Sequence, residues 1–308
     1  MMVPPREATR SARPANAGYQ ISTALLRIDR ATDLHSVPIT SLQNPKVKHL
    51  RSLRLRKYRR REGRFLIEGI RIVEEALSCR APVDTLIFAP DLLVSPRAKA
   101  LVAEVEPNRR LALAEDVFRS ISDRDEPQGI AAVLRIEEPS LATIPVLEEM
   151  LVLVAWQLRD PGNLGSIIRT ADSAGATGMV IVEPSVDLYD PQTVRASMGS
   201  FFALPIVRLM DETALSPWFA QIRQAGLPLL VVGSSAQGDR FHFEADYGKH
   251  PLVLLVGSER QGLPALVRKE TDFVVRLPMM GRATSLNVSA ATAALVYEVI
   301  RQRRATRV

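Results

Sequence analysis

Five apolar runs in the C-terminal half of the chain constrain its fold more than any other feature. The first, Met150–Leu158, reads MLVLVAWQL and carries no charged residue. A continuous apolar run of this kind is typical of a strand that is buried on both faces, as in a parallel sheet. A helical pattern follows the first run at Ser166–Gly175, and another closes the chain. The sequence therefore predicts an α/β domain with a mostly parallel, doubly covered sheet, whose function lies beyond the carboxyl ends of its strands.

The N-terminal part of the chain predicts a second, smaller α/β domain. Residues 1–37 are rich in Pro, Ala, Ser, Thr and Arg, and we expect them to form a disordered tail. Strand and helix patterns then alternate over residues 38–136, as expected for a small α/β domain. The following stretch, Ile136–Pro145, is acidic and holds two prolines, so residues 137–149 are predicted to be a linker. The sheet domain described above would then occupy residues 150–308.

The positive charge of the chain is concentrated in one segment. The net charge is +6, but Lys46–Arg64 holds ten Lys or Arg and one acid, a local +9, which leaves 6 − 9 = −3 for the rest. Apolar residues at helical spacing place arginines around the remainder of a helix. Such a segment is either a solvated helix face or a contact for an anionic partner, and its local excess of charge favours a nucleic acid.

Several features of the sequence exclude particular classes of protein. Cys79 is the single cysteine, so no internal disulfide can form, and we expect it to be buried late in a helix. No apolar run approaches the roughly 18 to 20 residues of a membrane span, and no secretory signal begins the chain. The four histidines show no metal-ligand spacing. These features predict a cytoplasmic protein without a metal or a membrane partner.

Three stretches stand where apolar runs meet polar or helical patterns, namely Asp160–Gly178, Val256–Pro264 and Leu277–Ala293. They read DPGNLGSIIRTADSAGATG, VGSERQGLP and LPMMGRATSLNVSAATA. They contain no Ser/His/Asp pattern, no Walker loop and no GxGxxG, so a nicotinamide-dependent oxidoreductase is disfavoured. Because no protein nucleophile is evident, we expect the substrate to supply the nucleophile. Their position predicts one shared ligand site.

Each stretch also has a simpler interpretation when it is taken alone. Asn163 suits a helix cap, and Arg169 suits an exposed helix face. The glycines around Val256–Pro264 suit an ordinary turn between a strand and a helix. Ser285 is a good N-cap for the last helix. The order and spacing of the three stretches, rather than any single one, favour a binding site.

In that order and spacing, the three stretches resemble the signature motifs of the SpoU (TrmH-like) RNA 2′-O-ribose methyltransferases of the SPOUT superfamily. Val194–Pro205 and Glu126–Val133 also resemble segments of this family. The resemblance implies a C-terminal domain with a deep trefoil knot, an N-terminal substrate-binding domain related to a ribosomal protein, a homodimer, and S-adenosylmethionine as the cofactor. It implies catalytic or site-shaping roles for Asn163, Arg169, Glu259, Ser285 and Asn287, and cofactor contacts by Val256, Gly257, Gly262, Leu277, Pro278 and Leu286.

The same resemblance implies methylation of a ribose 2′-hydroxyl in structured RNA, with 23S rRNA as the first expectation and tRNA as the second. A non-catalytic RNA-binding protein in ribosome assembly is the alternative of another class. Arg169 would either act after deprotonation or hold the target phosphate and stabilise oxyanion charge, and we favour the second role because an arginine pKa exceeds about 12. The residues expected to contact RNA phosphates are Arg54, Arg56, Arg59, Arg60 and Arg195.

Overall fold

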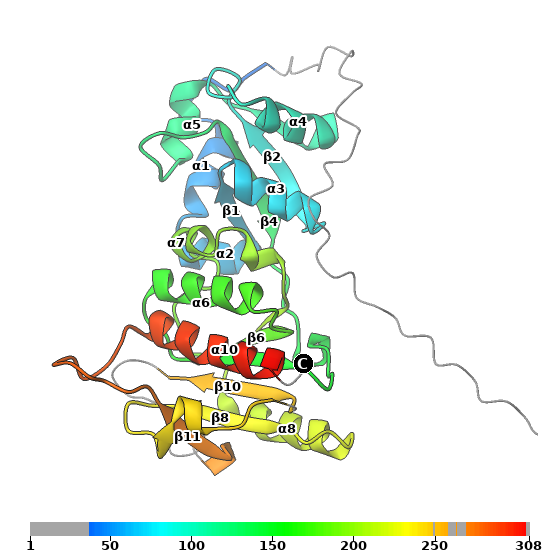
Figure 1. Ribbon diagram of the computed structural model, residues 1–308. Coiled ribbons are helices and arrows are strands. Elements are labelled where there is room, and N and C mark those ends of the chain that lie inside the picture. Colours follow the sequence, from blue (N-terminus) through cyan, green and yellow to red (C-terminus); the bar gives the residue numbers. More distant parts are fainter. Residues whose placement is uncertain (1–36, 249, 258–262, 264–268, 306–308) are drawn as a thin grey trace, which may run out of the picture. The chain divides into compact units, whose positions relative to one another are not determined.

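The computed structural model describes residues 37–248, 250–257, 263 and 269–305, which all fall within one compact unit, Ser36–Val308 (Figure 1). Residues 1–36 of the predicted tail, Glu259 and Gly262 lie outside these residues. Within the described part of the chain, two β-sheets are present, with four and seven strands. No helix among these residues is long and apolar enough to cross a membrane.

The smaller sheet has the strand order β1-β4-β2-β3 and confirms the predicted N-terminal α/β pattern. Its β1–β4 and β4–β2 pairs are antiparallel, and its β2–β3 pair is parallel. The sequence had not indicated β3 or α5. The strands are β1 Arg64–Glu68, β2 Val83–Phe88, β3 Arg110–Ala112 and β4 Ile130–Arg135, and the helices are α1 Pro45–Ser52, α2 Arg56–Glu62, α3 Ile70–Ser78, α4 Pro96–Glu104 and α5 Glu115–Ile121.

The larger sheet has the strand order β7-β6-β5-β10-β8-β11-β9, and every neighbouring pair is parallel. The five apolar runs of the sequence all contain strands of this sheet, as predicted, namely Met150–Leu158, Met179–Val182, Pro228–Gly233, Pro251–Gly257 and Asp272–Pro278. The strands are β5 Leu151–Trp156, β6 Gly178–Val182, β7 Ile206–Leu209, β8 Leu230–Ser234, β9 Arg240–Phe241, β10 Leu252–Val256 and β11 Phe273–Arg276. The helices are α6 Pro161–Ser173, α7 Pro191–Ala196, α8 Leu215–Gln224 and α10 Val288–Ala305.

Helices cover both faces of the larger sheet. The apolar face of α8, including Trp218 and Phe219, packs in one core with Val152 and Val154 of β5 and with alternate residues of the neighbouring strands. Because side chains alternate along a strand, Leu153 points to the opposite face, where α6 and α10 lie side by side (Figure 1). Burial on both faces explains why β5 reads as an unbroken apolar run.

The segment between the two sheets is held against the protein at two points. Ile144 is buried in the core under the larger sheet, and its side chain approaches the Cα of Gly178 at the start of β6. The Tyr189 hydroxyl donates a hydrogen bond of 2.9 Å to the Glu137 carbonyl oxygen. Burial raises the pKa of this phenol to about 12. The stretch predicted as a linker therefore packs as part of the structure.

Two local expectations are corrected. The basic segment forms two helices rather than one, because the chain leaves helical geometry between Leu53 and Arg56. Val47, Leu50 and Leu53 are buried as the apolar stripe predicts, but the second helix buries Arg59. Cys79 is exposed rather than buried, because it follows the last turn of α3 as its C-cap.

Helices α6 and α7 pack closely against each other at Gly165. A Cβ atom on Gly165 would lie 2.4 Å from the Thr193 carbonyl oxygen and 2.6 Å from the Ala196 Cβ atom. Glycine is therefore required because the α7 backbone occupies the space of a side chain. This contact fixes α7 on the helix that carries the first motif.

We predict that Gly165→Val separates α6 from α7 and lowers the free energy of unfolding by about 1 to 3 kcal/mol, since overpacking a filled contact has this cost. Chemical denaturation monitored by circular dichroism measures the change. Gly281→Ala is the matched control, because no atom lies within 4 Å of a Cβ placed there. Equal stabilities of the two variants would contradict the packing account.

Candidate functional site

The parallel sheet brings the starts of the three motifs to one edge. β10 pairs with β5 on one side and with β8 on the other, so Ala155, Val256 and Ser234 are in register near the carboxyl ends of their strands. Val275 of β11 is paired with Ser234 in the same way. The loops that follow β5, β10, β8 and β11 therefore leave the sheet at one edge. This edge is the predicted location of the ligand site.

The first motif begins α6 through a side-chain cap. Asp160 is the N-cap, and its Oδ1 atom accepts a hydrogen bond of 2.7 Å from the backbone amide of Asn163. The capping role that Asn163 could have had thus belongs to Asp160. The Asn163 side chain contacts the third motif, where its Oδ1 atom accepts a hydrogen bond of 2.8 Å from Nδ2 of Asn287. Two of the predicted site residues, 124 positions apart in the sequence, are therefore in contact.

The third motif begins α10 at Val288, three residues later than the sequence predicted. Asn287, not Ser285, provides the terminal contact, because its Oδ1 atom accepts hydrogen bonds from the backbone amide and hydroxyl of Ser289 at 2.9 and 2.6 Å. Ser285 is exposed in the loop before the helix. Asn287 uses its amide oxygen at the helix start and its amide nitrogen on Asn163. It therefore fixes the two motifs to each other.

The residues predicted to contact the cofactor lie along the same edge. Val256 is buried at the end of β10, and Gly257 follows it. Leu277 is half-buried after β11, and Pro278 is exposed beside it. Leu286, on the loop before α10, exposes 45% of its surface although it is apolar. Glu259 and Gly262, in the second motif, lie outside the described residues.

Arg169 is not brought into contact with the asparagine pair. It is exposed on α6, six residues after Asn163. At about 100° per residue, this spacing turns its side chain about 240° around the helix from that of Asn163. The neighbouring Ile168 is buried against the sheet domain, so Arg169 faces outward. One copy of the chain therefore presents Arg169 on its surface, apart from the asparagine pair.

A fourth loop at this edge was not singled out in the sequence. After β8, the Ser235 amide donates a hydrogen bond of 3.0 Å to the Val275 carbonyl oxygen, and the Asp239 amide donates one of 2.8 Å to that of Val274. A Cβ atom on Gly238 would lie 2.4 Å from the Val275 carbonyl carbon, so the loop folds tightly onto β11. The signal was present, because SSAQG is a small, polar, glycine-containing stretch directly after an apolar run.

The basic segment places its predicted RNA-binding residues in different environments. Arg54 is half-buried, and its Nη2 atom donates to the Ser122 carbonyl oxygen and to Asp123. The Nη2 atom of Arg56 lies 3.7 Å from a carboxylate oxygen of Glu183. These contacts engage both arginines within the protein. Arg54 is therefore paired with a carboxylate of the chain itself, whereas Arg56 shares Glu183 with Arg208, which lies closer, at 2.7 Å.

The prediction that Arg59 contacts RNA phosphates is wrong. Its side chain is 2% exposed, and its Nε and Nη2 atoms donate to one oxygen of Asp187 at 3.0 and 2.6 Å. Removing one partner of such a buried ion pair costs about 3 to 5 kcal/mol, because the other charge is left without compensation. A guanidinium committed in this way cannot bind a phosphate. Its position within a run of arginines gave no sign of this role.

Other cations of the segment remain on the surface. Arg60 and Arg195 are exposed, and their contact with RNA stays a prediction. Lys57 and Arg61 are exposed as well, and their charged groups lie 4.9 and 4.7 Å from the centre of the Tyr58 ring. Lys57, Arg60 and Arg61 have the spacing i, i+3, i+4, so they share one face of α2. This face, rather than the whole segment, is suited to an anionic partner.

Family models match both parts of the chain. Residues 150–297 match the SpoU rRNA Methylase family, and residues 44–132 match the MRM3-like substrate binding domain. The chain is 37% identical to a 23S rRNA (uridine(2479)-2′-O)-methyltransferase of Streptomyces viridochromogenes, over 80% of this chain and 86% of that protein. It is 34% identical to the 23S rRNA (guanosine(2553)-2′-O)-methyltransferase RlmP of Bacillus subtilis, over 85% of this chain and 98% of that protein.

A solved structure extends the likeness to the fold. The crystal structure of the SpoU methyltransferase AviRb from Streptomyces viridochromogenes, in complex with AdoMet, aligns with a TM-score of 0.80 and 35% identity. The alignment covers 85% of this chain and 99% of that one. It therefore includes both sheets and the edge at which the motifs meet. On the sequence motifs, the family models and the shared fold, the chain belongs to the SpoU rRNA methylase family.

Proposed function

We propose that this chain transfers the methyl group of S-adenosylmethionine to a ribose 2′-hydroxyl of large-subunit ribosomal RNA. The observation that carries the proposal is the hydrogen bond between Asn163 and Asn287, which joins the first and third motifs at the carboxyl edge of the sheet. Both relatives described above, which match along most of their lengths, are named as 23S rRNA 2′-O-methyltransferases. Ribosomal RNA is therefore favoured over tRNA.

The residues at this edge fit S-adenosylmethionine. Gly257 leaves backbone groups accessible at the end of a buried strand, where a ligand can approach closely. Leu277 is half-buried and Leu286 is exposed, so both can provide apolar contact surface to an adenine ring. Ser235, after β8, adds polar groups between these loops. When bound, the cofactor supplies an electrophilic methyl group on a positively charged sulfur.

The chain's own residues have to position the ribose oxygen and stabilise its charge. The 2′-hydroxyl is the nucleophile and also distinguishes RNA from DNA. Alignment of reacting groups can supply roughly 7 to 11 kcal/mol of a barrier in ideal cases. Arg169 is assigned to the phosphate beside the target ribose and to the oxyanion that develops as the hydroxyl proton leaves. A guanidinium remains charged at neutral pH, which suits this role better than proton abstraction.

A homodimer completes the site in this proposal. Arg169 is exposed and directed away from the asparagine pair of its own chain, as expected for a residue that serves a second copy. Residues 38–136 would hold the RNA, residues 137–149 would connect the two domains, and residues 150–308 would carry out the transfer. A deep trefoil knot in the last of these belongs to the same proposal, and its second-motif loop lies partly outside the described residues.

We predict that Arg169→Ala lowers the rate of methyl transfer by about 100-fold or more, because removal of one stabilising donor to a developing oxyanion has this effect. Binding of S-adenosylmethionine, measured by calorimetry, should remain close to that of the parent protein. Arg223→Ala is the matched control, since Arg223 is exposed on α8 on the other face of the sheet. Near-normal turnover of Arg169→Ala would remove Arg169 from the site.

We further predict that combined replacement of Lys57, Arg60 and Arg61 by Ala weakens binding to ribosomal RNA. The slope of log K against log salt should become shallower by about 2 to 3, since each phosphate contact contributes about 0.7 to 0.9. The control replaces Lys99, Arg109 and Arg223, which are exposed elsewhere and carry the same charge. If the slope of log K against log salt is unchanged in the first variant, this face of α2 is a solvated surface and does not contact RNA phosphates.

A further inference from the structure

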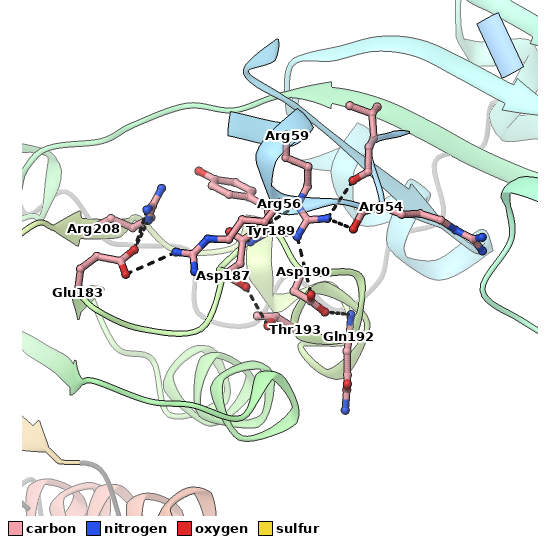
Figure 2. A network of polar contacts seen from close by, with 11 residues as sticks. Arg54, Arg56, Arg59, Glu183, Asp187, Tyr189, Asp190, Gln192, Thr193 and Arg208 are labelled. Atoms are coloured by element: carbon pink, nitrogen blue, oxygen red, sulfur yellow. Dashed lines mark hydrogen bonds and ion pairs between the residues drawn. The ribbon is translucent and has the colours of Figure 1, made fainter. Parts of the chain in front are cut away.

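The buried arginine of the basic segment joins the two parts of the chain. Arg59 lies on α2, beside the smaller sheet, whereas its partner Asp187 lies in the loop that leads from β6 of the larger sheet to α7. Figure 2 shows the guanidinium between this loop and the backbone at the start of α2. The two residues are 128 positions apart. Their ion pair is therefore a long-range contact between the helix that carries the RNA-facing cations and the methyltransferase fold.

The donors of Arg59 are shared between the two parts. Nε and Nη2 donate to Asp187, and Nη2 also lies 3.8 Å from an oxygen of Asp190. Nη1 donates to the carbonyl oxygens of Leu53 and Arg54, at 2.9 and 2.6 Å. A guanidinium holds its donors in a fixed plane, so these bonds determine both the distance and the orientation of α2. A lysine could supply charge but not this geometry.

On the other side, the partners of Arg59 are fixed to α7. The Asp187 carbonyl oxygen accepts a hydrogen bond of 3.2 Å from the Thr193 hydroxyl, and Asp190 caps α7 by accepting one of 2.9 Å from the Gln192 amide. Thr193 is the residue whose backbone packs on Gly165 of α6. A continuous series of contacts therefore runs from α2 through α7 to the helix that carries Asn163 and Arg169.

A second connection runs through the same loop. Glu183 accepts two hydrogen bonds from Arg208, and its other oxygen lies 3.7 Å from Arg56 of α2 (Figure 2). The Ser185 hydroxyl accepts a hydrogen bond of 3.0 Å from the Leu158 amide, just before Asp160 begins the first motif. The loop 183–190 thus contacts α2 through Glu183 and Asp187, and the segment that leads into α6 through Ser185.

We propose that Arg59 and Asp187 are positioning residues, which hold the RNA-facing side of α2 at a fixed place relative to α6 and thereby determine which ribose of the bound RNA reaches the transfer site. The proposal rests on the proposed function above. Arg59 and the outward Lys57 lie about 200° apart around α2, so one helix contacts the catalytic domain and the RNA on different sides. An apolar contact could also hold α2 against the larger sheet domain. The Arg59–Asp187 ion pair additionally fixes the orientation of α2, because the donors of the guanidinium lie in a fixed plane.

The test uses Asp187→Asn, which retains the size of the side chain and removes its charge, in the full-length protein. We expect kcat for ribosomal RNA to fall by about 10- to 100-fold, since small misplacement of reacting groups has this effect. The KM for RNA and the affinity for S-adenosylmethionine should change little. Mapping of the methylated nucleotides should show methyl groups at riboses next to the normal target. Arg60→Ala is the matched control, in which KM rises and the methylated position is unchanged.

Unchanged kcat together with a single, unchanged methylated position in Asp187→Asn would overturn the positioning role. If this variant does not fold, Arg59→Lys is measured in the same way, because it retains the ion pair and loses the fixed fork; the same two outcomes then decide. A parent protein that methylates no ribosomal RNA would instead contradict the proposed function. The two failures are therefore distinguishable.

Discussion

The parallel direction of all seven strands in the larger sheet is the constraint on which the candidate site depends. Parallel strands end at the same edge, so residues far apart in the sequence leave the sheet side by side. This arrangement allows Asn163, after β5, to contact Asn287, before α10. The cost is that parallel neighbours need long crossover connections and that the central strands are buried on both faces, as β5, β6 and β10 are.

Helix α6 transmits this arrangement to the rest of the protein. Its first turn carries Asn163, its exposed side carries Arg169, and Gly165 between them allows α7 to approach its backbone. The loop before α7 receives the buried guanidinium of Arg59. The candidate site, the packing of α6 on α7 and the contact with α2 thus follow one another along the structure. A change at any of these contacts is expected to affect the others through α6.

The sequence was most informative where one local property determines structure. The continuous apolar run of β5 predicted its burial, and the motif order predicted that Asn163 and Asn287 share a site. The sequence was least informative where a residue that is distant in the sequence determines whether a side chain is buried or exposed. Arg59 reads like its neighbouring arginines, and only Asp187, far along the chain, makes it internal. The start of α10 was misplaced because Ser285 is a good cap by type, whereas Asn287 has the required geometry.

The most direct test of the account is a comparison of ribose methylation in 23S rRNA from cells with and without this gene. Mass spectrometry of defined rRNA fragments would locate each 2′-O-methyl group. The account predicts that one ribose methylation is absent from the deletion strain and returns when the gene is restored. An unchanged 23S rRNA pattern, with or without a change in tRNA, would contradict the claim that this chain methylates the large-subunit RNA.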